Sequence, residues 1–483
     1  MTDTIFERSF PGRRAFVAAV TDVPAQALDD LIPATLQRQV PARLPEVAEI
    51  DLVRHYTELS RLNFGVENGP YLLGSCTMKY NPKINEQVAS LEGFNGLHPY
   101  QPEDTTQGAL AVLHALGEWL AEIAGLHATT LQPAAGAHGE LTGLLLIHAH
   151  HTAQGRSPRT VIIPDTAHGT NPASVVMAGF TPRAVRSDAR GGVDMDELRA
   201  AVDDDTSALM LTNPNTLGLF DEHIAEIAEI VHAAGGLLYY DGANANAVLG
   251  RSRPGDMGFD VVHFNTHKSF STPHGGGGPG AGPIVVRDSL ERFLPVPVVV
   301  REGGRYRFDY DRPDSIGKVR TFYGNFGVLV RAYAYIRGLG AEGLNRVSDM
   351  AVLNANYVLA GVRDLFEVPY DRRCMHEFVV SGEPLKQYGL KTLDFAKRLL
   401  DKGVHPPTTY FPLIVPEALM VEPTETESKD ALDAVIAAFR EVMDEATRDP
   451  GLLKEAPSTM PVRRLDEVRA VRQPVLRHQF DDD

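Results

Sequence analysis

Cysteine is almost absent from this sequence: Cys76 and Cys374 are the only two among 483 residues. Two cysteines cannot form a disulfide framework, and neither belongs to a CxxC or Cys/His spacing typical of a metal site. No stretch approaches the roughly 18 consecutive apolar residues of a membrane span. The first twenty residues carry Glu7, Arg8 and Arg13 and no long apolar run, which argues against a signal peptide. We therefore expect a cytoplasmic protein in a reducing compartment, with no bound metal and no membrane contact.

Basic residues are also outnumbered, with 46 Lys and Arg against 63 Asp and Glu and a net charge of −17. Such an excess of acid disfavours nonspecific binding to nucleic acid or to anionic membranes. The length suits two or three domains, since a domain averages about 150 residues. This balance is ordinary for a soluble enzyme that has no nucleic-acid partner.

Four short apolar runs each end in polar or small residues. Runs of this length are typical of buried strands, and ligands in open α/β sheets gather at the carboxyl ends of such strands. Between residues 108 and 290 strand-like and helix-like segments alternate, which predicts an α/β fold with a mostly parallel, helix-covered sheet. The runs, with the residues that follow them, are 161–164 with His168, 208–212 with Asn213 and Asn215, 237–240 with Asp241 and Ala243, and 261–264 with His267 and Lys268.

An acid, a lysine and a histidine at such strand ends are what pyridoxal 5'-phosphate (PLP) requires. In PLP enzymes a lysine holds the cofactor as a Schiff base, an acid pairs with the pyridinium nitrogen, and a flat side chain covers the ring. Lys268 precedes the glycine-rich stretch 275–280 and is the predicted cofactor lysine. Asp241 is the predicted partner of the ring nitrogen, and His168 is the predicted ring cover. These three are the candidate catalytic residues.

Other residues complete the expected cofactor site. Ala243 is small enough to pack flat under the second face of the ring. Asn213 or Asn215 could hydrogen-bond the phenolic oxygen of the cofactor. His267 abuts Lys268 and could contact the phosphate, shuttle a proton, or be purely structural.

The turn Gly136-Ala137-His138 leads into an apolar run and is the predicted phosphate site. Unpaired N–H groups at a helix start, together with the helix dipole, favour an anion. PLP enzymes of the aspartate-aminotransferase fold (fold type I) present a phosphate turn, a ring-stacking residue, an asparagine, an aspartate and a lysine in that order. This chain offers the same order: Gly136, His168, Asn213, Asp241 and Lys268.

Composition shifts along the chain suggest three parts. Residues 1–62 are expected to form an N-terminal arm with helices, 63–330 a large PLP-binding domain, and 331–483 a small C-terminal α+β domain with a tail. The region 63–107 is rich in turn residues, and a loop of that length inside a domain is usually functional. Lys79, Asn95 and His98 in this region are candidates for substrate contact, or they only fold the loop.

Several longer strings are specific enough to compare with a known family. They are 73–79 (LGSCTMK), 168–174 (HGTNPAS), 241–247 (DGANANA), 265–268 (NTHK), 275–280 (GGGGPG) and 422–429 (EPTETESK). Together they resemble the P-protein family of the glycine cleavage system, the PLP-dependent glycine decarboxylases. The resemblance runs from about residue 50 almost to the C-terminus. The chain is similar to the catalytic second half of the single-chain P-protein, and hence to the second subunit of the two-subunit form.

The resemblance implies an activity and partners that the residues alone do not show. It implies an oxidoreductase of glycine catabolism that decarboxylates glycine, releases carbon dioxide and transfers the aminomethyl group to the lipoyl cofactor of H-protein. It also implies a separate subunit 1, in an α2β2 heterotetramer, and an active site close to region 63–107 and to the subunit boundary.

Two alternatives stay open. One is another PLP enzyme of the same fold, an aminotransferase or an amino-acid decarboxylase. An aminotransferase normally needs an arginine clamp for the substrate carboxylate, and none can be assigned among Arg301, Arg305, Arg307 and Arg320. The other is a non-catalytic regulatory subunit, against which the intact Asp241 and Lys268 argue.

Overall fold

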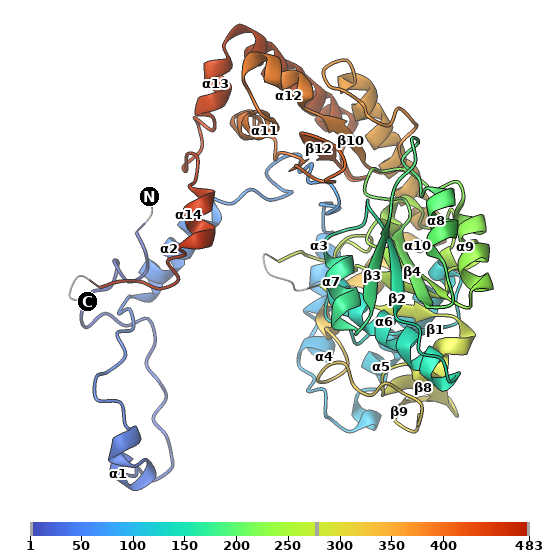
Figure 1. Cartoon of the computed structure of the whole chain (residues 1–483). Coiled ribbons are helices and arrows are strands. Elements are labelled where there is room, and N and C mark those ends of the chain that lie inside the picture. Colours follow the sequence, from blue (N-terminus) through green and yellow to red (C-terminus); the bar gives the residue numbers. More distant parts are fainter. Residues whose placement is uncertain (1–2, 276–279, 481–483) are drawn as a thin grey trace. The chain divides into compact units, whose positions relative to one another are not determined.

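The computed structural model of the chain describes residues 3–275 and 280–480 (Figure 1). The described residues form two compact units, one that runs up to Gly65 and includes the segment from Glu455 onward, and one from Val66 to Lys454. Residues 276–279 of the glycine-rich stretch lie outside the described part, so its expected place beside Lys268 stays a prediction. The smaller unit contains α1 (Leu28–Leu31), α2 (Glu49–Ser60) and α14 (Glu467–Arg472).

A seven-stranded sheet forms the centre of the larger unit, in the order β1-β7-β6-β5-β4-β2-β3. Strands β2 to β6 pair in parallel, while β7 runs antiparallel to both of its neighbours. The expectation of a mostly parallel α/β fold is therefore confirmed. The strands are β1 (Ala128–Thr130), β2 (Thr160–Pro164), β3 (Thr181–Val185), β4 (Thr206–Thr212), β5 (Leu237–Gly242), β6 (Val261–Phe264) and β7 (Ile284–Val286).

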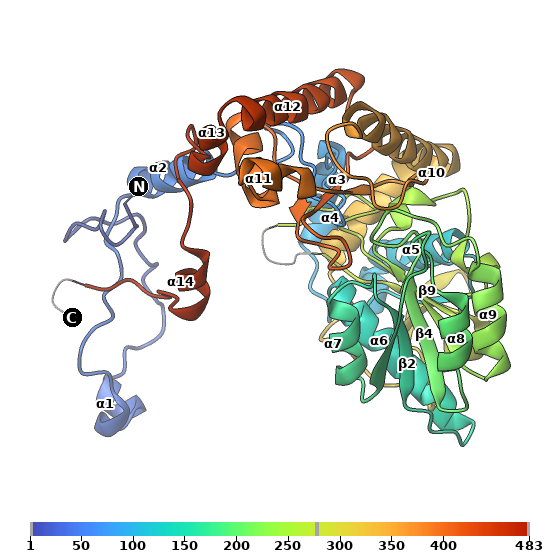
Figure 2. The ribbon, with the colours of Figure 1, turned by 45° about the horizontal axis from the view of Figure 1, so that its top comes forward.

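Helices cover both faces of this sheet (Figures 1 and 2). Successive residues of a strand point to opposite faces, so Leu238 and Tyr240 of β5 join one buried cluster and Tyr239 joins another. A strand that is buried on both faces needs a continuous apolar run, which explains why the sequence shows no alternation here. Helices α5 (Gln107–Ala124), α8 (Met195–Ala201) and α9 (Ile224–Ala233) pack into the first cluster; α6 (Gly136–Ala153) and α7 (Thr170–Met177) pack into the second.

Helix α10 (Phe326–Val362) leads from the large sheet to a smaller α+β part and bends at Gly340, where φ is 63°. A three-stranded antiparallel sheet in the order β10-β12-β11 lies there, and its apolar side chains share one buried cluster with residues of several helices, the second half of α10 among them. The expected boundary at residue 330 falls within α10 and stays a prediction. The elements are β10 (Phe378–Ser381), β11 (Thr408–Thr409), β12 (Ala418–Val421), α11 (Thr392–Asp401), α12 (Lys429–Arg448) and α13 (Pro450–Glu455).

The remaining elements of the larger unit are short. The turn-rich region 63–107 contains α3 and α4, and a hairpin of β8 and β9 precedes α10. Single turns of 3₁₀ helix connect several strands and helices. The bounds are α3 (Lys83–Ala89), α4 (Glu92–Asn95), β8 (Val298–Glu302), β9 (Arg305–Asp309), and 3₁₀ turns at Glu103–Thr105, Ala245–Ala247, Pro254–Met257, Asp288–Phe293 and Glu383–Tyr388.

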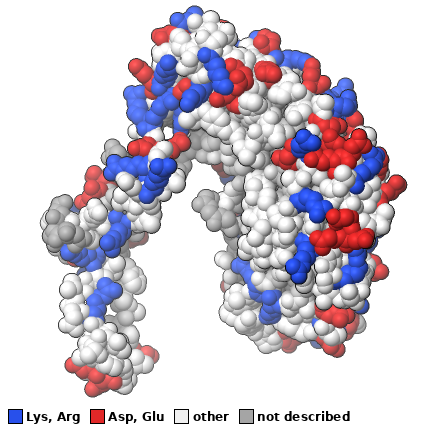
Figure 3. Space-filling view, in the orientation of Figure 1, with Lys and Arg blue, Asp and Glu red and all other residues white. Residues whose placement is uncertain are grey.

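The surface of the larger unit carries charges of both signs, which are interspersed over the face shown in Figure 3. Although acids outnumber bases in the sequence, neither sign covers this face continuously, so it presents no single strong electrostatic field. Within the described residues, none of the helices combines the length and the apolar character that crossing a membrane requires.

Candidate active site

A cavity of about 240 Å³ lies where β5 and β6 end and α6 begins. Seven of the nine predicted cofactor-site residues line it, although they come from four separate stretches of the chain. The seven are Gly136, Ala137, His168, Asp241, Ala243, His267 and Lys268. The other residues that line it are Ala135, Glu140, Thr170, Asn265, His274 and Gly280.

Asp241 presents a buried carboxylate to this cavity, with only 2% of the residue exposed. Its Oδ2 accepts a hydrogen bond from Asn171 Nδ2 at 3.0 Å, and its Oδ1 accepts one from the backbone N–H of Ala243 at 3.0 Å. His263 Nε2 lies 3.3 Å from Oδ1, because β5 and β6 pair with Asp241 opposite His263. Three groups from different elements thus fix the carboxylate in one orientation.

The charge of Asp241 is stabilised despite its burial. Burial by itself raises the pKa of a carboxyl group. Here the nearby His263, the hydrogen bonds from Asn171 and Ala243 and the charge of Lys268 outweigh burial, so the pKa of Asp241 lies below its ordinary value. Asp241 is therefore a fixed negative charge at the cavity, which is what a protonated ring nitrogen needs as its partner.

Lys268 reaches the same cavity from the turn that follows β6. Its Nζ donates a hydrogen bond to the backbone carbonyl of Ser75 at 2.6 Å. The side chain is half-buried, so the amine is held at the cavity wall and does not extend into solvent. A lysine placed in this way, a short distance from a buried acid, suits attachment of an aldehyde cofactor.

The beginning of α6 forms an anion site at one end of the cavity. No side chain caps the helix at Ala135, and unpaired N–H groups of a helix start attract a phosphate. A Cβ at position 136 would lie 2.0 Å from Asn265 Oδ1. Only glycine, which has no Cβ, lets the backbone approach the Asn265 side chain this closely. Asn265 Oδ1 is buried and has no hydrogen-bond partner among the described residues, and the same holds for His267 Nδ1. These orphaned polar atoms and the uncapped helix fit a bound phosphate ester.

His267 is neutral at physiological pH. Burial, the charge of Lys268 and the neighbouring His274 lower the pKa of His267 to about 3. A neutral imidazole offers one donor and one acceptor, so His267 suits a hydrogen bond to the phosphate better than an ionic contact. Which of the three expected roles it has stays a prediction.

The structure does not bring His138 and the two strand-end asparagines to the cavity. His138 Nδ1 accepts a hydrogen bond from the backbone N–H of Ala134. Asn213 Oδ1 accepts from the backbone N–H of Asp221, and Asn215 Oδ1 accepts from the backbone N–H of Leu217. These side chains fold local turns, so the contacts expected of them with phosphate and phenolic oxygen have no geometric support here.

Sequence reasoning missed several residues that line the cavity or hold Asp241 beside it. Asn171 and Asn265 lie within two of the family-like strings, which was the available signal for both. His263 gave no local signal, because it meets Asp241 only through the pairing of β5 with β6. Glu140 accepts hydrogen bonds from Thr170 and Ser174 and so ties α6 to α7 beside the cavity.

The candidates from region 63–107 lie outside this cavity. Lys79 is 3% exposed, and its Nζ contacts Asn246, Ser269, Tyr335 and Glu425. An ammonium group with this set of partners is structural, so the expectation that Lys79 touches substrate has no support. Asn95 and His98 are exposed and do not line the cavity.

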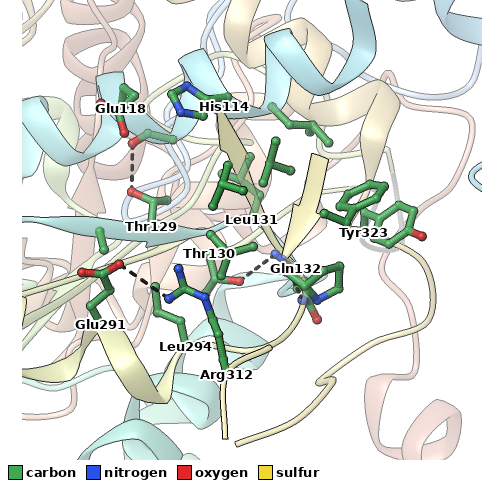
Figure 4. Close-up of a pocket in the computed structure, with 18 of the residues that line it drawn as sticks. His114, Glu118, Thr129, Thr130, Leu131, Gln132, Glu291, Leu294, Arg312 and Tyr323 are labelled. Atoms are coloured by element: carbon green, nitrogen blue, oxygen red, sulfur yellow. Dashed lines mark hydrogen bonds and ion pairs between the residues drawn. The ribbon is translucent and has the colours of Figure 1, made fainter. Parts of the chain in front are cut away.

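A second cavity, of about 470 Å³, lies between α5, β1 and the β8–β9 hairpin (Figure 4). It is larger than the Lys268 cavity but lacks a lysine and a buried acid facing each other. Arg312 and Glu291, its charged pair, lie 3.5 Å apart and neutralise each other. We therefore assign no chemistry to this cavity.

The free energy of unfolding of the chain at acid pH should depend on His376, which lies close enough to Lys268 to be affected by its charge. The residue is fully buried, and burial and the charge of Lys268 lower its pKa to about 3. An unfolded histidine binds its proton near pH 6.5, so unfolding takes up a proton here between pH 6.5 and 3. Stability from the neutral His376 is thus present above pH 6.5 and is lost as pH falls toward 3.

His376→Gln should therefore flatten the dependence of the free energy of unfolding on pH in this window. The expected change in slope is up to one proton, or about 1.4 kcal/mol per pH unit. Urea unfolding of the apoprotein at half-unit steps from pH 4 to pH 6.5 measures it. Equal slopes for the wild type and the variant would show that His376 does not titrate in the folded state as described.

Comparison with known proteins places these observations in context. The family described as "Glycine cleavage system P-protein" matches residues 17–302, and "Glycine dehydrogenase, C-terminal domain" matches residues 347–455. A protein named "Probable glycine dehydrogenase (decarboxylating) subunit 2" from Caldanaerobacter subterraneus subsp. tengcongensis is 58% identical over 474 residues and covers 98% of both chains. A protein of the same name from Halalkalibacterium halodurans is 59% identical over 476 residues and also covers 98% of both chains.

Solved structures show the same fold at low identity. A glycine decarboxylase (P-protein) of the glycine cleavage system, in inhibitor-bound form, superposes with a TM-score of 0.73 at 20% identity, over 86% of this chain and 95% of its own. A cysteine desulfurase from Thermococcus onnurineus superposes with a TM-score of 0.60 at 14% identity, over 78% of this chain and 95% of its own.

Proposed function

The chain belongs to the glycine cleavage system P-protein family, and we propose that the cavity at Lys268 is the site where it decarboxylates glycine with PLP. The protein is a PLP-dependent glycine dehydrogenase (decarboxylating), and its relatives carry the designation subunit 2. One observation carries the assignment of the site: a single cavity joins Lys268, the buried Asp241 and the uncapped start of α6.

Each side chain has a distinct task in this proposal. PLP, when bound, supplies an electron-withdrawing ring that accepts the electron pair left on glycine Cα as the carboxylate departs as carbon dioxide. Asp241 holds a proton at the ring nitrogen through its fixed negative charge. Lys268 would hold the aldehyde group of the cofactor through its Nζ until glycine binds. The N–H groups of Gly136 and Ala137 hold the phosphate, helped by the dipole of α6.

The two faces of the cofactor ring are assigned to His168 and Ala243, which both line the cavity. His168 is exposed, and its Nδ1 lies 2.9 Å from Thr170 Oγ1, which restrains the imidazole. Ala243 is held by its backbone N–H, which donates to Asp241. A small residue on one face and a flat ring on the other leave room for a planar cofactor between them.

His168→Ala should weaken cofactor retention and leave the fold intact. Stacking of two flat rings contributes roughly a 3- to 10-fold factor in binding, while an exposed side chain contributes little to stability. Equilibrium dialysis of PLP and the thermal melting temperature measure the two effects. His148→Ala, at an exposed histidine outside the cavity, is the matched control. Unchanged PLP affinity in His168→Ala would leave that residue without a role in binding the cofactor.

An aminotransferase is less well supported by the same cavity. Aminotransferases normally hold the carboxylate of their substrates with an arginine clamp. Among the residues that the structure describes, no arginine lines the Lys268 cavity. Glycine has a single carboxylate, the one that is lost, so the absence of a clamp agrees with glycine as substrate.

The designation of the relatives as subunit 2 implies a partner subunit 1. We further place the chain in a cytoplasmic α2β2 heterotetramer that passes the aminomethyl group to the lipoyl arm of H-protein. The free thiols of Cys76 and Cys374 suit a reducing cytoplasm.

The proposed function is tested by exchange of labelled bicarbonate into the carboxyl group of glycine. We expect exchange near background with this chain alone, measurable exchange with subunit 1, and the highest rate once lipoylated H-protein is added. Region 63–107 has little apolar periodicity, and ordering a loop costs roughly 1–2 kcal/mol per residue, which a partner surface could offset. Full exchange by the isolated chain would contradict the two-subunit assignment and leave the cofactor site standing.

A further inference from the structure

The segment Gly74–Thr77 is strained and lies against Lys268. Ser75 and Thr77 both have positive φ, 63° and 50°, although neither is glycine. Such residues are uncommon, are unfavourable for a side chain other than glycine, and persist only where the surroundings hold them. The carbonyl of Ser75 is the group that accepts the hydrogen bond from Lys268 Nζ. The strained segment therefore contacts Lys268, the lysine to which the proposed function assigns the cofactor.

Two buried glutamates of the small sheet hold both strained residues. Glu377 Oε2 accepts a hydrogen bond from the backbone N–H of Ser75 at 2.7 Å. Glu422 Oε2 accepts one from the backbone N–H of Thr77 at 2.8 Å, and its Oε1 accepts one from Thr77 Oγ1 at 2.5 Å. The two glutamates are 0% and 1% exposed. A buried donor that loses its acceptor is costly, so these hydrogen bonds oppose opening of the segment.

The fold places the two glutamates side by side. Glu377 immediately precedes β10 and Glu422 immediately follows β12, and these antiparallel strands pair Phe378 with Val421. Both carboxylates therefore emerge at the same end of the small sheet. Glu377 Oε1 also accepts from Asn244 Nδ2, three residues beyond Asp241. The pair thus links the small sheet to the strained segment and to the strand end that carries Asp241.

The pair is costly if its task is only to stabilise the fold. Burial, and then the charge of Glu422, raise the pKa of Glu377; burial also raises the pKa of Glu422. Lys268 opposes both shifts, and His376 Nε2 lies 3.7 Å from Glu422 Oε1. Buried ionisable groups are often replaced by apolar residues without loss of stability. Their position at the strained segment points to a task at the site.

We propose that Glu377 and Glu422 are positioning residues that clamp the Gly74–Thr77 segment, so that the carbonyl of Ser75 receives the Lys268 ammonium when glycine takes the place of the lysine. This inference rests on the proposed function for the role of Lys268. Neither glutamate touches the cavity. Each acts through the backbone of the segment, and the segment in turn sets where the released amine is held.

Cys76 offers a direct reporter of the clamp, because it lies between the two strained residues. It is half-buried, and burial raises its pKa to about 11, so its thiol should react slowly. Cys374 is 2% exposed and packs in the core of the small sheet, which makes it an internal reference. The rate of iodoacetamide labelling at each cysteine, followed by mass spectrometry, can be measured on the PLP-loaded complex with subunit 1.

Glu377→Gln and Glu422→Gln are the test variants, because a glutamine cannot accept on both of its terminal atoms. The matched control is Glu417→Gln, since Glu417 Oε2 accepts from the backbone N–H of Thr392 in the small domain, away from the segment. Thr77→Val is a milder variant that keeps the N–H bond to Glu422 and loses only the hydroxyl bond. If a glutamate variant fails to fold, the labelling of Cys76 in Thr77→Val still tests the proposal.

We expect Cys76 to react roughly tenfold faster or more in Glu377→Gln and Glu422→Gln, with a smaller rise in Thr77→Val, since loss of a buried hydrogen bond favours local opening. Cys374 and Glu417→Gln should match the wild type. The kcat of glycine exchange should fall about tenfold in the glutamate variants at unchanged PLP content.

Unchanged labelling of Cys76 would overturn the clamp. Faster labelling with full kcat would overturn the link from the clamp to Lys268. Cofactor found on another lysine would instead overturn the proposed function, and the labelling of Cys76 would still report on the clamp.

Discussion

Replacing Lys268 with alanine should abolish glycine exchange by the complex, with a loss of about 10⁴-fold or more. Removing the central group of a catalytic unit costs this much when no neighbour replaces it. No other lysine lines the cavity within the described residues, and Lys79 is committed to four buried contacts. The nearest alternative amine is therefore held by the fold and is not free to react.

The loss must be separated from unfolding and from general effects of removing a lysine. Lys83→Ala is the matched control, because Lys83 is exposed and pairs with Glu67 on the surface. It should keep activity within about twofold of the wild type. Circular dichroism and gel filtration with subunit 1 establish that both variants are folded and assembled. Activity of Lys268→Ala within tenfold of the control would remove the lysine from the mechanism.

Asp241→Asn should lower the rate of glycine exchange by at least about 10²- to 10³-fold while the fold survives. Loss of an electrostatic partner in a desolvated site has effects of this size. Asparagine retains the volume and one acceptor for the N–H of Ala243, but it has no charge with which to keep the ring nitrogen protonated. The rate should therefore fall in kcat, while the amount of bound PLP changes far less.

Asp260→Asn is a suitable control for the effect of losing a buried aspartate. Asp260 is 3% exposed and accepts hydrogen bonds from His232 and from the backbone N–H of Leu238, away from the cavity. Its variant should lose stability but keep its kcat per folded molecule. If Asp241→Asn stays within about a factor of ten of the wild type, Asp241 does not hold the proton at the ring nitrogen.

The parts of the site that follow strands could be predicted from local sequence. Asp241 comes directly after one apolar run and Lys268 lies on the turn that follows another. The carboxyl ends of parallel strands meet at one edge of a sheet. The order of these runs and their flanking residues was therefore enough to place both side chains at one cavity. The glycine-containing turn before α6 was recognisable for a similar reason, because a helix start leaves N–H groups unpaired.

The predicted cofactor contacts that the structure does not support also have a physical explanation. Asn213 stands at a strand end as Asp241 does, but its Oδ1 accepts a hydrogen bond from the backbone N–H of Asp221 in the turn that follows, which position along the chain does not show. His138 lies in the phosphate turn, yet its ring folds back on Ala134. Position along the chain predicts where a backbone goes; the direction of a side chain depends on the partners that surround it.

Long-range pairing could not be predicted at all. His263 reaches Asp241 only because β5 and β6 align in one register. Glu377 and Glu422 meet Ser75 and Thr77 across about 300 and 345 residues of sequence. Glu377 has no local signal that distinguishes it from a surface acid, and Glu422 has only its place in the family-like string 422–429. The burial of both becomes visible only once the small sheet is packed. For the same reason the sequence left open whether Lys79 contacts substrate or only folds the loop, since its four partners come from distant parts of the chain.

The identity of the lysine that carries the cofactor tests the account most directly. The purified complex with subunit 1 and PLP is reduced with borohydride, digested, and mapped by mass spectrometry. We predict that the pyridoxyl label lies on the peptide that contains Lys268 and on no other peptide of this chain. A label on any other lysine, or an unlabelled chain, would contradict the assignment of the cavity and of the chemistry that depends on it.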